Sequence, residues 1–448
     1  MKYSVITFGC RVNQADSLGF EEELLAAGAV AAAPQDADHV VVNSCSVTAT
    51  ADQGTRQTIR RIARDNPGAR IIVTGCYATR RPDEVAALPG VQRVVLNDDK
   101  PRLMQLLRRP EGTAAGAQTA EKTLGSAFFA VSAISSGSDG PCGATIEPGV
   151  AGRTAFTLRV QTGCAEACSY CIIPTTRGAP RSVSPAEILR EVHRVTAAGF
   201  KEIALTGVHL GSYGRDLQPA SSLIELLRAL ELRGARSGGS GRPDDDPDVL
   251  FRISSLEPMD CSRDVVDLVA SSDRFAPHFH LPLQHASNRM LSAMRRPYTI
   301  EYFSSLVDDI RARMPNASIG SDVIVGFPCE TDDDFEQLAA YLERSPLTHI
   351  HVFPYSDRPG TAASAMTAKV NGVVVRERGR RIRDIGRRLS ERFRDSQVGT
   401  THRALTLEDG SLAVTGNYLK LRIPPGRLRN EWVRVRMVSQ DHGELLGG

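Results

Sequence analysis

The sequence has few aromatic residues, a single tryptophan and no long apolar run. Because no run of about 18 apolar residues occurs, we expect no membrane-spanning helix. The first seven residues, MKYSVIT, lack the apolar core and the cleavage site of a signal peptide. Hydrophobic residues make up 41% and charged residues 24% of the chain, which argues against a disordered or fibrous protein. We therefore expect a cytoplasmic globular protein.

The net charge is also small, with a formal value of +2 over the 448 residues. This charge is unevenly distributed. Residues 376–448 contain 16 Lys and Arg against 9 Asp and Glu, a local excess of +7, and the remaining 375 residues sum to −5. Such an asymmetry favours an anionic partner for the C-terminal end.

The chain has nine cysteines, and an odd number without a secretion signal argues against a disulfide framework. In a reducing compartment, clustered cysteines more often bind metal, so their spacing decides the interpretation. Three of them, Cys142, Cys261 and Cys329, fit no ligand spacing. The other six form two groups of three, which are Cys164, Cys168 and Cys171, and Cys10, Cys45 and Cys76.

The length predicts two or three domains, since one domain takes about 150 residues. Residues 1–109 alternate short apolar strands with helical stretches, which is typical of a parallel α/β sheet. Residues 110–150 are rich in Ala, Gly, Ser and Thr without periodicity, and they predict a linker. The candidate strands of the first region are Ser4–Phe8, His39–Asn43, Arg70–Thr74 and Arg93–Leu96.

Residues 151–375 contain six strand–helix units, which predict a barrel or partial barrel of the (β/α)6 type. An Arg-rich helix is expected over 376–397. Residues 398–448 have short strands with Gly and Pro turns, which predict a small β-barrel. The six candidate barrel strands are Thr157–Val160, Glu202–Thr206, Leu250–Ser254, His278–Leu283, Ile319–Val325 and His349–Phe353.

The strongest motif, which we call the loop triad, is Cys164-x-x-x-Cys168-x-x-Cys171, placed just after an apolar strand. A structural zinc site normally has four protein ligands, and a 4Fe–4S cluster usually takes four cysteines. Three thiolates therefore leave one iron of a 4Fe–4S cluster open to a substrate or cofactor. The alternative is a tight loop whose cysteines are inert or bind zinc.

The second group, which we call the strand-end triad, consists of Cys10, Cys45 and Cys76. Each follows a candidate parallel strand, and the carboxyl ends of such strands face one crevice. The three thiols can therefore converge although 31 to 35 residues separate them. The alternative is that they are small buried side chains, because free cysteine is often buried.

The loop triad, with the aromatic Tyr170 before its third cysteine, resembles the cluster loop of the radical S-adenosylmethionine superfamily. The chain as a whole resembles the methylthiotransferase family, outside residues 110–150 and 234–248. That resemblance implies a three-cysteine N-terminal domain, a radical S-adenosylmethionine barrel and a C-terminal TRAM-like β-barrel. It also implies two 4Fe–4S clusters, one on each triad, with S-adenosylmethionine on the open iron of the loop-triad cluster.

The segment TGVHLGSYG, residues 206–214, resembles the branch of this family that acts on N6-threonylcarbamoyladenosine 37 of transfer RNA. The Gly-Gln-Asn-Val-Asn pattern of the isopentenyladenosine branch is absent here. The resemblance implies conversion of the base to its 2-methylthio derivative, with a deoxyadenosyl radical activating carbon 2 and the second cluster delivering sulfur. The alternatives are another transfer RNA adenosine, an aspartate of a ribosomal protein, or a non-catalytic iron–sulfur protein that binds RNA.

Catalytic and cofactor-binding groups gather at the carboxyl ends of barrel strands. Strand packing or loop solvation is the alternative role for each such residue, and His285 could instead cap a helix. Arg177 and Arg181 follow the loop triad and could contact a cofactor carboxylate, an RNA phosphate or a structural ion-pair partner. The expected cofactor contacts are Tyr170, Thr206, Gly207, Glu257, Gln284 and Asp322, with His285 and Gly326 beside them.

The Arg-rich helix and the last segment predict an RNA surface, because phosphate attraction needs positive charge but no sequence reading. We expect the anticodon stem–loop of transfer RNA as the partner, with Tyr418 able to stack on bases. Trp432 is expected in the core of the last barrel. The sequence identifies neither the electron donor nor the source of sulfur. The residues expected to bind RNA are Lys420, Arg422, Arg427 and Arg429.

Overall fold

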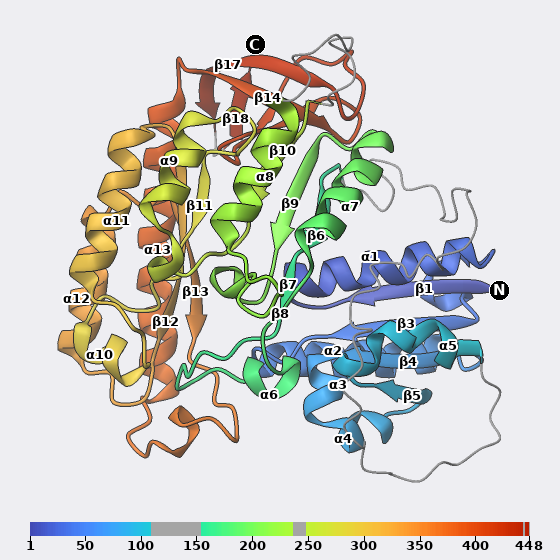
Figure 1. Ribbon diagram of the computed structural model, residues 1–448. Helices are drawn as coiled ribbons and strands as arrows, with labels where there is room; N and C mark the ends of the chain where they lie inside the picture. Colours follow the sequence, from blue (N-terminus) through green and yellow to red (C-terminus); the bar gives the residue numbers. More distant parts are fainter. Residues whose placement is uncertain (109–153, 236–247, 442–443, 448) are drawn as a thin grey trace. The chain divides into compact units, whose positions relative to one another are not determined.

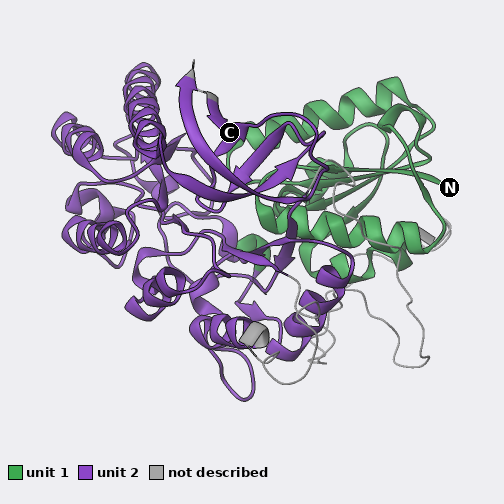
Figure 2. Cartoon of the chain, turned by 90° about the horizontal axis from the view of Figure 1, so that it is seen from above, with its two compact units in different colours: residues 1–145, 175–177 green, residues 146–174, 178–448 purple. Residues whose placement is uncertain are grey.

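The computed structural model describes residues 1–108, 154–235, 248–441 and 444–447. The expected linker 110–150, with Cys142, lies outside these residues, as does most of the loop at 234–248. The chain forms two compact units, which Figure 2 colours separately. The first comprises residues 1–145 and 175–177, and the second comprises residues 146–174 and 178–448. The short segment 175–177 thus groups with the first unit, although the sequence places it within the barrel region.

The first unit contains a five-stranded parallel sheet with strand order β2-β1-β3-β4-β5. The central strand β3, HVVVNS, is an almost continuous buried apolar run, as expected for a parallel strand covered on both faces. Its four longer strands confirm the sequence prediction, whereas the two-residue β2 is too short to leave a pattern. The strands are β1 (Lys2–Thr7), β2 (Val30–Ala31), β3 (His39–Ser44), β4 (Arg70–Gly75) and β5 (Val91–Val95).

The helices of the first unit pack on this sheet (Figure 1). The side chain of Thr48 caps α2 by accepting a hydrogen bond from the backbone of Ala51, which satisfies one otherwise unpaired donor. The apolar face of α2 then joins the core between β3 and β4. The helices are α1 (Arg11–Ala26), α2 (Ala49–Asp65), α3 (Cys76–Arg80), α4 (Pro82–Ala86) and α5 (Leu103–Arg108), with the 3-10 turns η1 (Pro34–Asp36) and η2 (Asn97–Arg102).

The second unit contains the six strands expected for a partial barrel, arranged as two three-stranded parallel sheets. Their orders are β10-β9-β6 and β11-β12-β13, so sequential strands are neighbours within each sheet. A short antiparallel pair, β7 with β8, carries the loop that follows β6. The strands are β6 (Phe156–Arg159), β7 (Gln161–Thr162), β8 (Arg181–Ser182), β9 (Glu202–Thr206), β10 (Leu250–Ile253), β11 (His278–His280), β12 (Ser318–Val325) and β13 (His349–Pro354).

Helices follow these strands in alternation (Figure 1). Two of them begin with capping boxes, Ser184 with Glu187 on α7 and Thr331 with Asp334 on α12, which fix where each helix starts. The helices are α6 (Ile173–Arg177), α7 (Pro185–Ala197), α8 (Leu223–Ala235), α9 (Arg263–Ser271), α10 (Asn288–Ala293), α11 (Ile300–Arg313), α12 (Asp332–Arg344) and α13 (Gly372–Gln397), with the 3-10 turns η4 (Leu210–Ser212), η5 (Pro258–Asp260) and η6 (Ala363–Ala365).

The C-terminal segment forms a closed barrel with strand order β14-β15-β16-β18-β17, which confirms the expected small β-barrel. Its interior is apolar and also contacts Phe393 of α13. None of the helices in the described residues is long and apolar enough to cross a membrane. The strands are β14 (Thr401–Leu407), β15 (Leu412–Thr415), β16 (Lys420–Arg422), β17 (Trp432–Asp441) and β18 (Glu444–Gly447).

Candidate functional site

The strand-end triad lies at one edge of the five-stranded sheet. Cys10 is the N-cap residue of α1, which follows β1, and Cys45 directly follows β3. Cys76 follows β4 and is the first residue of α3. Because β1, β3 and β4 are adjacent and parallel, all three thiols emerge at the carboxyl edge, as the sequence predicted.

Two glycines let these strand ends approach closely. A Cβ added at Gly9, whose φ is +92°, would lie 2.5 Å from the Sγ of Cys45. A Cβ at Gly75, whose φ is +97°, would collide with the backbone of Ser44. Both positions also have left-handed backbone that favours glycine. The backbone next to Cys10 therefore lies against Cys45, and the backbone next to Cys76 lies against the end of β3.

Buried charges lie next to this triad. The Nζ of Lys100 is 2.6 Å from Oδ2 of Asp16, and an Nη of Arg177 is 3.5 Å from the same oxygen. All three side chains are almost fully buried. Arg177 thus forms the ion pair that was one of its expected roles, with a carboxylate of its own unit. Two basic side chains thus share one carboxylate next to the triad.

The pKa shifts of the thiols reflect these surroundings. Burial raises the pKa of Cys45 to about 12. Burial also acts to raise the pKa of Cys76, but the charges of Arg177 and Lys100 outweigh it, so the net shift is downward. The amide of Asn97 lies 3.8 Å from the Sγ of Cys76. The buried cations thus favour the thiolate of Cys76, which is the form that binds metal.

The loop triad lies in the second unit, between β7 and α6. Backbone amides of Glu166 and Ile173 point at the sulfurs of Cys164 and Cys171, with N···S distances of 3.4 and 3.5 Å. Burial raises the pKa values of the three thiols, to about 11 for Cys164 and about 12 for Cys171. A bound metal would supply the positive charge that ionises them.

The loop is held in place by residues between and around its cysteines. Ser169 donates its backbone N–H to Met294 and its hydroxyl to Ala293, and it accepts a hydrogen bond from the backbone of Ala363. The next residue, Tyr170, packs edge-on against Phe327 at 6.4 Å between ring centroids. The expected cofactor contact Tyr170 is therefore a packed side chain that fixes the loop on the barrel.

Sequence analysis did not identify Arg296, which contacts the loop triad. Its guanidinium lies 3.2 Å from the Sγ of Cys168, forms an ion pair with Glu257 and donates to the hydroxyl of Tyr298. Arg296 thus contacts both the expected cofactor residue Glu257 and a cysteine of the loop triad. No motif marks Arg296, because it follows a helix rather than a barrel strand.

The end of β9 lies beside the start of the loop that carries the loop triad. Thr206 is buried, and its carbonyl accepts a hydrogen bond from the backbone of Val160. A Cβ added at Gly207 would lie 3.0 Å from the side-chain oxygen of Gln161, so only glycine fits there without displacement. Just beyond, Nε2 of His209 is 2.9 Å from Asp260, whose carboxylate helps raise the pKa of that imidazole against the effect of burial.

The remaining expected residues lie on β12 and the loops beside it. Gln284 has left-handed backbone and bridges to β12 through hydrogen bonds with Asp322 and Ile324. The carboxylate of Asp322 accepts hydrogen bonds from two imidazoles, His280 and His351. Asp322 thus faces histidines of the neighbouring strands.

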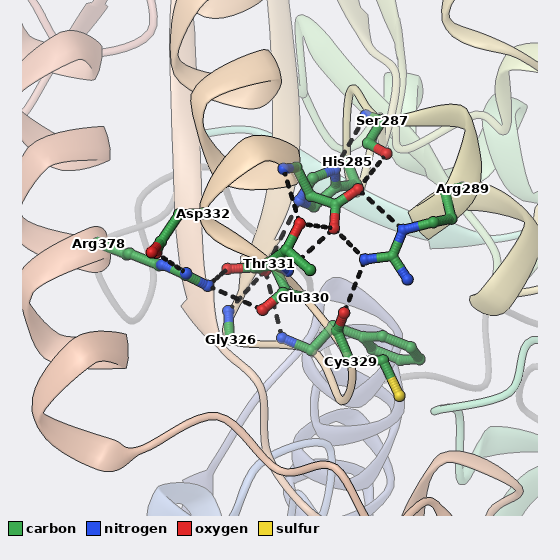
Figure 3. Close-up of polar contacts among 11 residues, drawn as sticks. His285, Ser287, Arg289, Gly326, Cys329, Glu330, Thr331, Asp332 and Arg378 are labelled. Carbon is green, nitrogen blue, oxygen red and sulfur yellow. Dashed lines mark hydrogen bonds and ion pairs between the residues drawn. The ribbon is translucent and has the colours of Figure 1, made fainter.

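His285 and Gly326 belong to a buried polar network around Glu330 (Figure 3). The carboxylate of Glu330 accepts the backbone N–H of Gly326 at 2.8 Å and pairs with Arg378 of α13. Nδ1 of His285 accepts the backbone N–H of Ser287, the N-cap residue of α10, at 3.0 Å. This network attaches α13 to the end of β12, so His285 contacts a helix start, the alternative that the sequence left open.

Three of the nine arginines of α13 form ion pairs with acidic residues of α12 or just before it. Arg381 and Arg388 form ion pairs with Glu336 and Glu343 of α12, and Arg378 pairs with Glu330 and Asp332. Within the described residues, the expected phosphate-binding face of this helix is therefore partly neutralised. The sequence shows the acidic residues of 330–343 but not that they face this helix.

The expected RNA-binding residues are exposed on the C-terminal barrel. Lys420 lies 3.4 Å from Glu408, Arg427 lies 3.4 Å from Glu431, and Arg429 donates to the carbonyl of Glu408. The prediction that Trp432 lies in the barrel core is wrong. The guanidinium carbon of Arg403 lies 3.7 Å from the centroid of the Trp432 indole ring. The indole N–H donates to the carbonyl of Asp248, a hydrogen bond that the apolar interior of the barrel does not offer. The side chain of Arg422, on β16, is also exposed.

Comparison with protein families gives two matches. Residues 2–97 match the family described as uncharacterized protein family UPF0004, and residues 158–342 match the radical SAM superfamily. The first match contains the strand-end triad, and the second contains the loop triad.

Relatives of known activity extend over nearly the whole chain. A threonylcarbamoyladenosine tRNA methylthiotransferase of Aquifex aeolicus is 35% identical over 94% of this chain and 96% of its own length. The enzyme of the same name from Bacillus subtilis is 33% identical over 86% of this chain and 80% of its own. A tRNA-2-methylthio-N(6)-dimethylallyladenosine synthase of Corynebacterium glutamicum is 33% identical over 91% of this chain and 75% of its own.

Among solved structures, the radical S-adenosylmethionine methyltransferase TsrM of Kitasatospora setae superposes with a TM-score of 0.55. The superposition covers 81% of this chain and 75% of that one, at 15% sequence identity. This similarity concerns the fold alone.

Proposed function

Because the chain belongs to the radical S-adenosylmethionine methylthiotransferase family, we propose that it converts N6-threonylcarbamoyladenosine 37 of transfer RNA to its 2-methylthio derivative. The observation that carries this proposal is the pair of cysteine triads, one at the sheet edge of the first unit and one in the barrel loop of the second. The segment 206–214 favours the threonylcarbamoyl substrate over the dimethylallyl one. A cytoplasmic location follows from a transfer RNA substrate.

The loop triad fits a 4Fe–4S cluster with one open iron. Its three thiols lie within eight residues, and two of the sulfurs face backbone N–H donors that would stabilise thiolates. When bound, the cluster and S-adenosylmethionine supply a deoxyadenosyl radical. Cys164, Cys168 and Cys171 would hold the cluster, and Arg296 places positive charge beside Cys168. Ser169 and Tyr170 keep the loop rigid.

We assign a second 4Fe–4S cluster to the strand-end triad. The support comes from the convergence of Cys10, Cys45 and Cys76 and from the buried Arg177, whose charge would compensate an anionic cluster. When bound, this cluster supplies or carries the sulfur that is transferred. The carboxylate of Asp16, which also pairs with Lys100, holds Arg177 in its buried position.

The contacts to S-adenosylmethionine are proposed at the barrel edge near the loop triad. Thr206 ends β9, and Gly207 follows it next to Gln161. Gln161 lies on β7, the strand that precedes the loop triad. Glu257 lies beside the triad through Arg296, and Gln284 continues β11 toward β12. These residues would orient the cofactor and exclude water from it.

The anticodon stem–loop of transfer RNA is proposed to contact the C-terminal barrel. The support is the group of exposed cations Lys420, Arg422, Arg427 and Arg429, of which the first two lie on β16. Phosphate contacts from such side chains position a nucleic acid without reading its sequence.

The proposal is tested by nucleoside mass spectrometry of transfer RNA from a strain that lacks both 2-methylthio modifications and expresses this chain. We expect 2-methylthio-N6-threonylcarbamoyladenosine to appear, and to be lost when the loop triad is replaced by alanine. Appearance of the dimethylallyl derivative instead would assign the chain to the other branch. If neither nucleoside forms, analysis of ribosomal proteins for methylthioaspartate tests the third substrate. Cleavage of S-adenosylmethionine by reduced protein tests the non-catalytic alternative.

A further inference from the structure

One face of the sheet β11-β12-β13 is polar, although parallel strands in a barrel normally carry branched aliphatic side chains. The outer strands each carry a His-x-His pair, and the middle strand carries a carboxylate between them. In the strand register His280 lies beside Gly320, and His351 lies beside Asp322. Because side chains alternate along a strand, these positions share one face. The polar positions of this face are His278, His280, Ser318, Asp322, His349 and His351, Gly320 lies among them, and the apolar Ile324 and Phe353 follow at its carboxyl end.

Three of these side chains point their donor atoms at one another. Oδ1 of Asp322 lies 3.0 Å from Nε2 of His280 and 3.1 Å from Nδ1 of His351. The three donor atoms all lie within 4.8 Å of one another. Two metal–ligand bonds of about 2.1 Å place their donors about 3.0 Å apart at the right angle of octahedral coordination and about 3.4 Å apart at the tetrahedral angle. The two N···O contacts, which are hydrogen bonds in the absence of an ion, therefore have a spacing that an ion with these three ligands can adopt with little movement of the side chains.

The surroundings keep these donors in place and accessible. A Cβ at Gly320 would collide with the ring of His349 and lie 3.0 Å from Nδ1 of His280, so the glycine leaves the space that the imidazoles occupy. The side chain of His351 is 58% exposed, which gives an ion a path to the group.

We propose that His280, Asp322 and His351 bind one divalent first-row transition-metal ion. Two imidazole nitrogens and a carboxylate oxygen are donors that such ions prefer, and three protein ligands leave coordination positions open. The site uses nitrogen and oxygen donors, so it differs in chemistry from both cysteine triads. Asp322 is then a metal ligand rather than the cofactor contact that its strand position suggested.

The test uses the full chain with its iron–sulfur clusters reconstituted, because empty cysteine triads would also bind zinc. The protein is dialysed anaerobically against zinc(II), and zinc and iron are counted per chain. We expect about one zinc in the wild type, and zinc affinity at least tenfold lower in Asp322→Asn and His351→Ala. His193→Ala, which removes an exposed histidine of α7, is the matched control and should keep its zinc.

Zinc K-edge absorption identifies the ligands in the presence of iron, and we expect nitrogen and oxygen neighbours without sulfur. The proposal is overturned if the wild type binds no zinc, if both variants bind as the wild type does, or if sulfur ligates the zinc. Iron content checks the folding of each variant. Should Asp322→Asn lose its iron, His351→Ala decides the outcome, because that side chain lies at the surface of the group.

Discussion

The charge of Arg177 beside the strand-end triad sets an expectation for the redox potential of the cluster proposed there. Arg177 is 3% exposed, and Cys76 is 2% exposed. Burial acts to lower the pKa of Arg177, but Cys76 and Asp16 outweigh it, so the net shift is upward and the guanidinium stays charged. A cluster with three thiolates becomes more negative on reduction, so a neighbouring cation stabilises the reduced form and raises the potential.

The size of the effect follows from Coulomb's law. At an effective dielectric constant of about 20, a unit charge roughly 8 Å away contributes about 2 kcal/mol. For a one-electron couple this corresponds to about 90 mV, since a tenfold change in the equilibrium constant is about 59 mV. We therefore expect Arg177→Gln to lower the midpoint potential by about 90 mV.

The assay is a redox titration monitored by electron paramagnetic resonance in a background whose loop triad is replaced by alanine. Only the second cluster is then present, so one midpoint is measured. Arg177→Lys should recover most of the potential, because it keeps the charge. Arg56→Gln is the matched control, since Arg56 is an arginine of the same unit that pairs with Glu84.

An unchanged midpoint in Arg177→Gln, with iron content retained, would refute the reasoning about the buried charge. If that variant loses its iron, wild type and Arg177→Lys are compared instead, and a midpoint that falls by about 90 mV in the lysine variant, although the charge is kept, then contradicts the reasoning. If the variant whose loop triad is replaced by alanine contains no cluster at all, the assignment of a second cluster is refuted.

Three further predictions follow from the two triads and the C-terminal barrel. Replacing the loop triad by alanine should lower iron from about eight to about four atoms per chain by iron analysis, and unchanged iron would remove the triad from the cluster assignment. Cys76→Ala should retain cleavage of S-adenosylmethionine but form no methylthio nucleoside by mass spectrometry; normal product formation would exclude Cys76 as a ligand. Arg427→Glu combined with Arg429→Glu should weaken transfer RNA binding and make its salt dependence shallower by about two phosphate contacts, with S-adenosylmethionine cleavage retained. Equal affinity across a salt titration would remove these arginines from the RNA surface.

Much of the fold could be predicted because it rests on local patterns. The run VVVN of β3 and the run EIALT of β9 are short and apolar, and the structure places strands there within one or two residues of the expected bounds. The position of the cysteines at strand ends was sufficient to predict that Cys10, Cys45 and Cys76 share one edge. The two-residue strand β2 has too few residues for any periodicity to appear.

The parts that sequence analysis missed depend on pairings between distant residues. Lys100 and Asp16 are 84 positions apart, and their ion pair requires the order of the sheet to be known. The His-x-His pairs of β11 and β13 are visible in the sequence, but only the register of β12 between them brings Asp322 to their side. The rim position of Trp432 likewise depends on Arg403 and Asp248, which lie on other segments.

A common arrangement appears in the two units despite their different folds. In the first, a buried arginine lowers the pKa of Cys76, and in the second Arg296 lies 3.2 Å from the Sγ of Cys168. Arg296 is 128 positions from Cys168, and each arginine is held by a carboxylate, Asp16 or Glu257. Each guanidinium is paired with a carboxylate, and its charge also lowers the free energy of a negative group bound at the neighbouring cysteines. A cation fixed next to each triad thus supports the proposal that an anionic cluster binds at both.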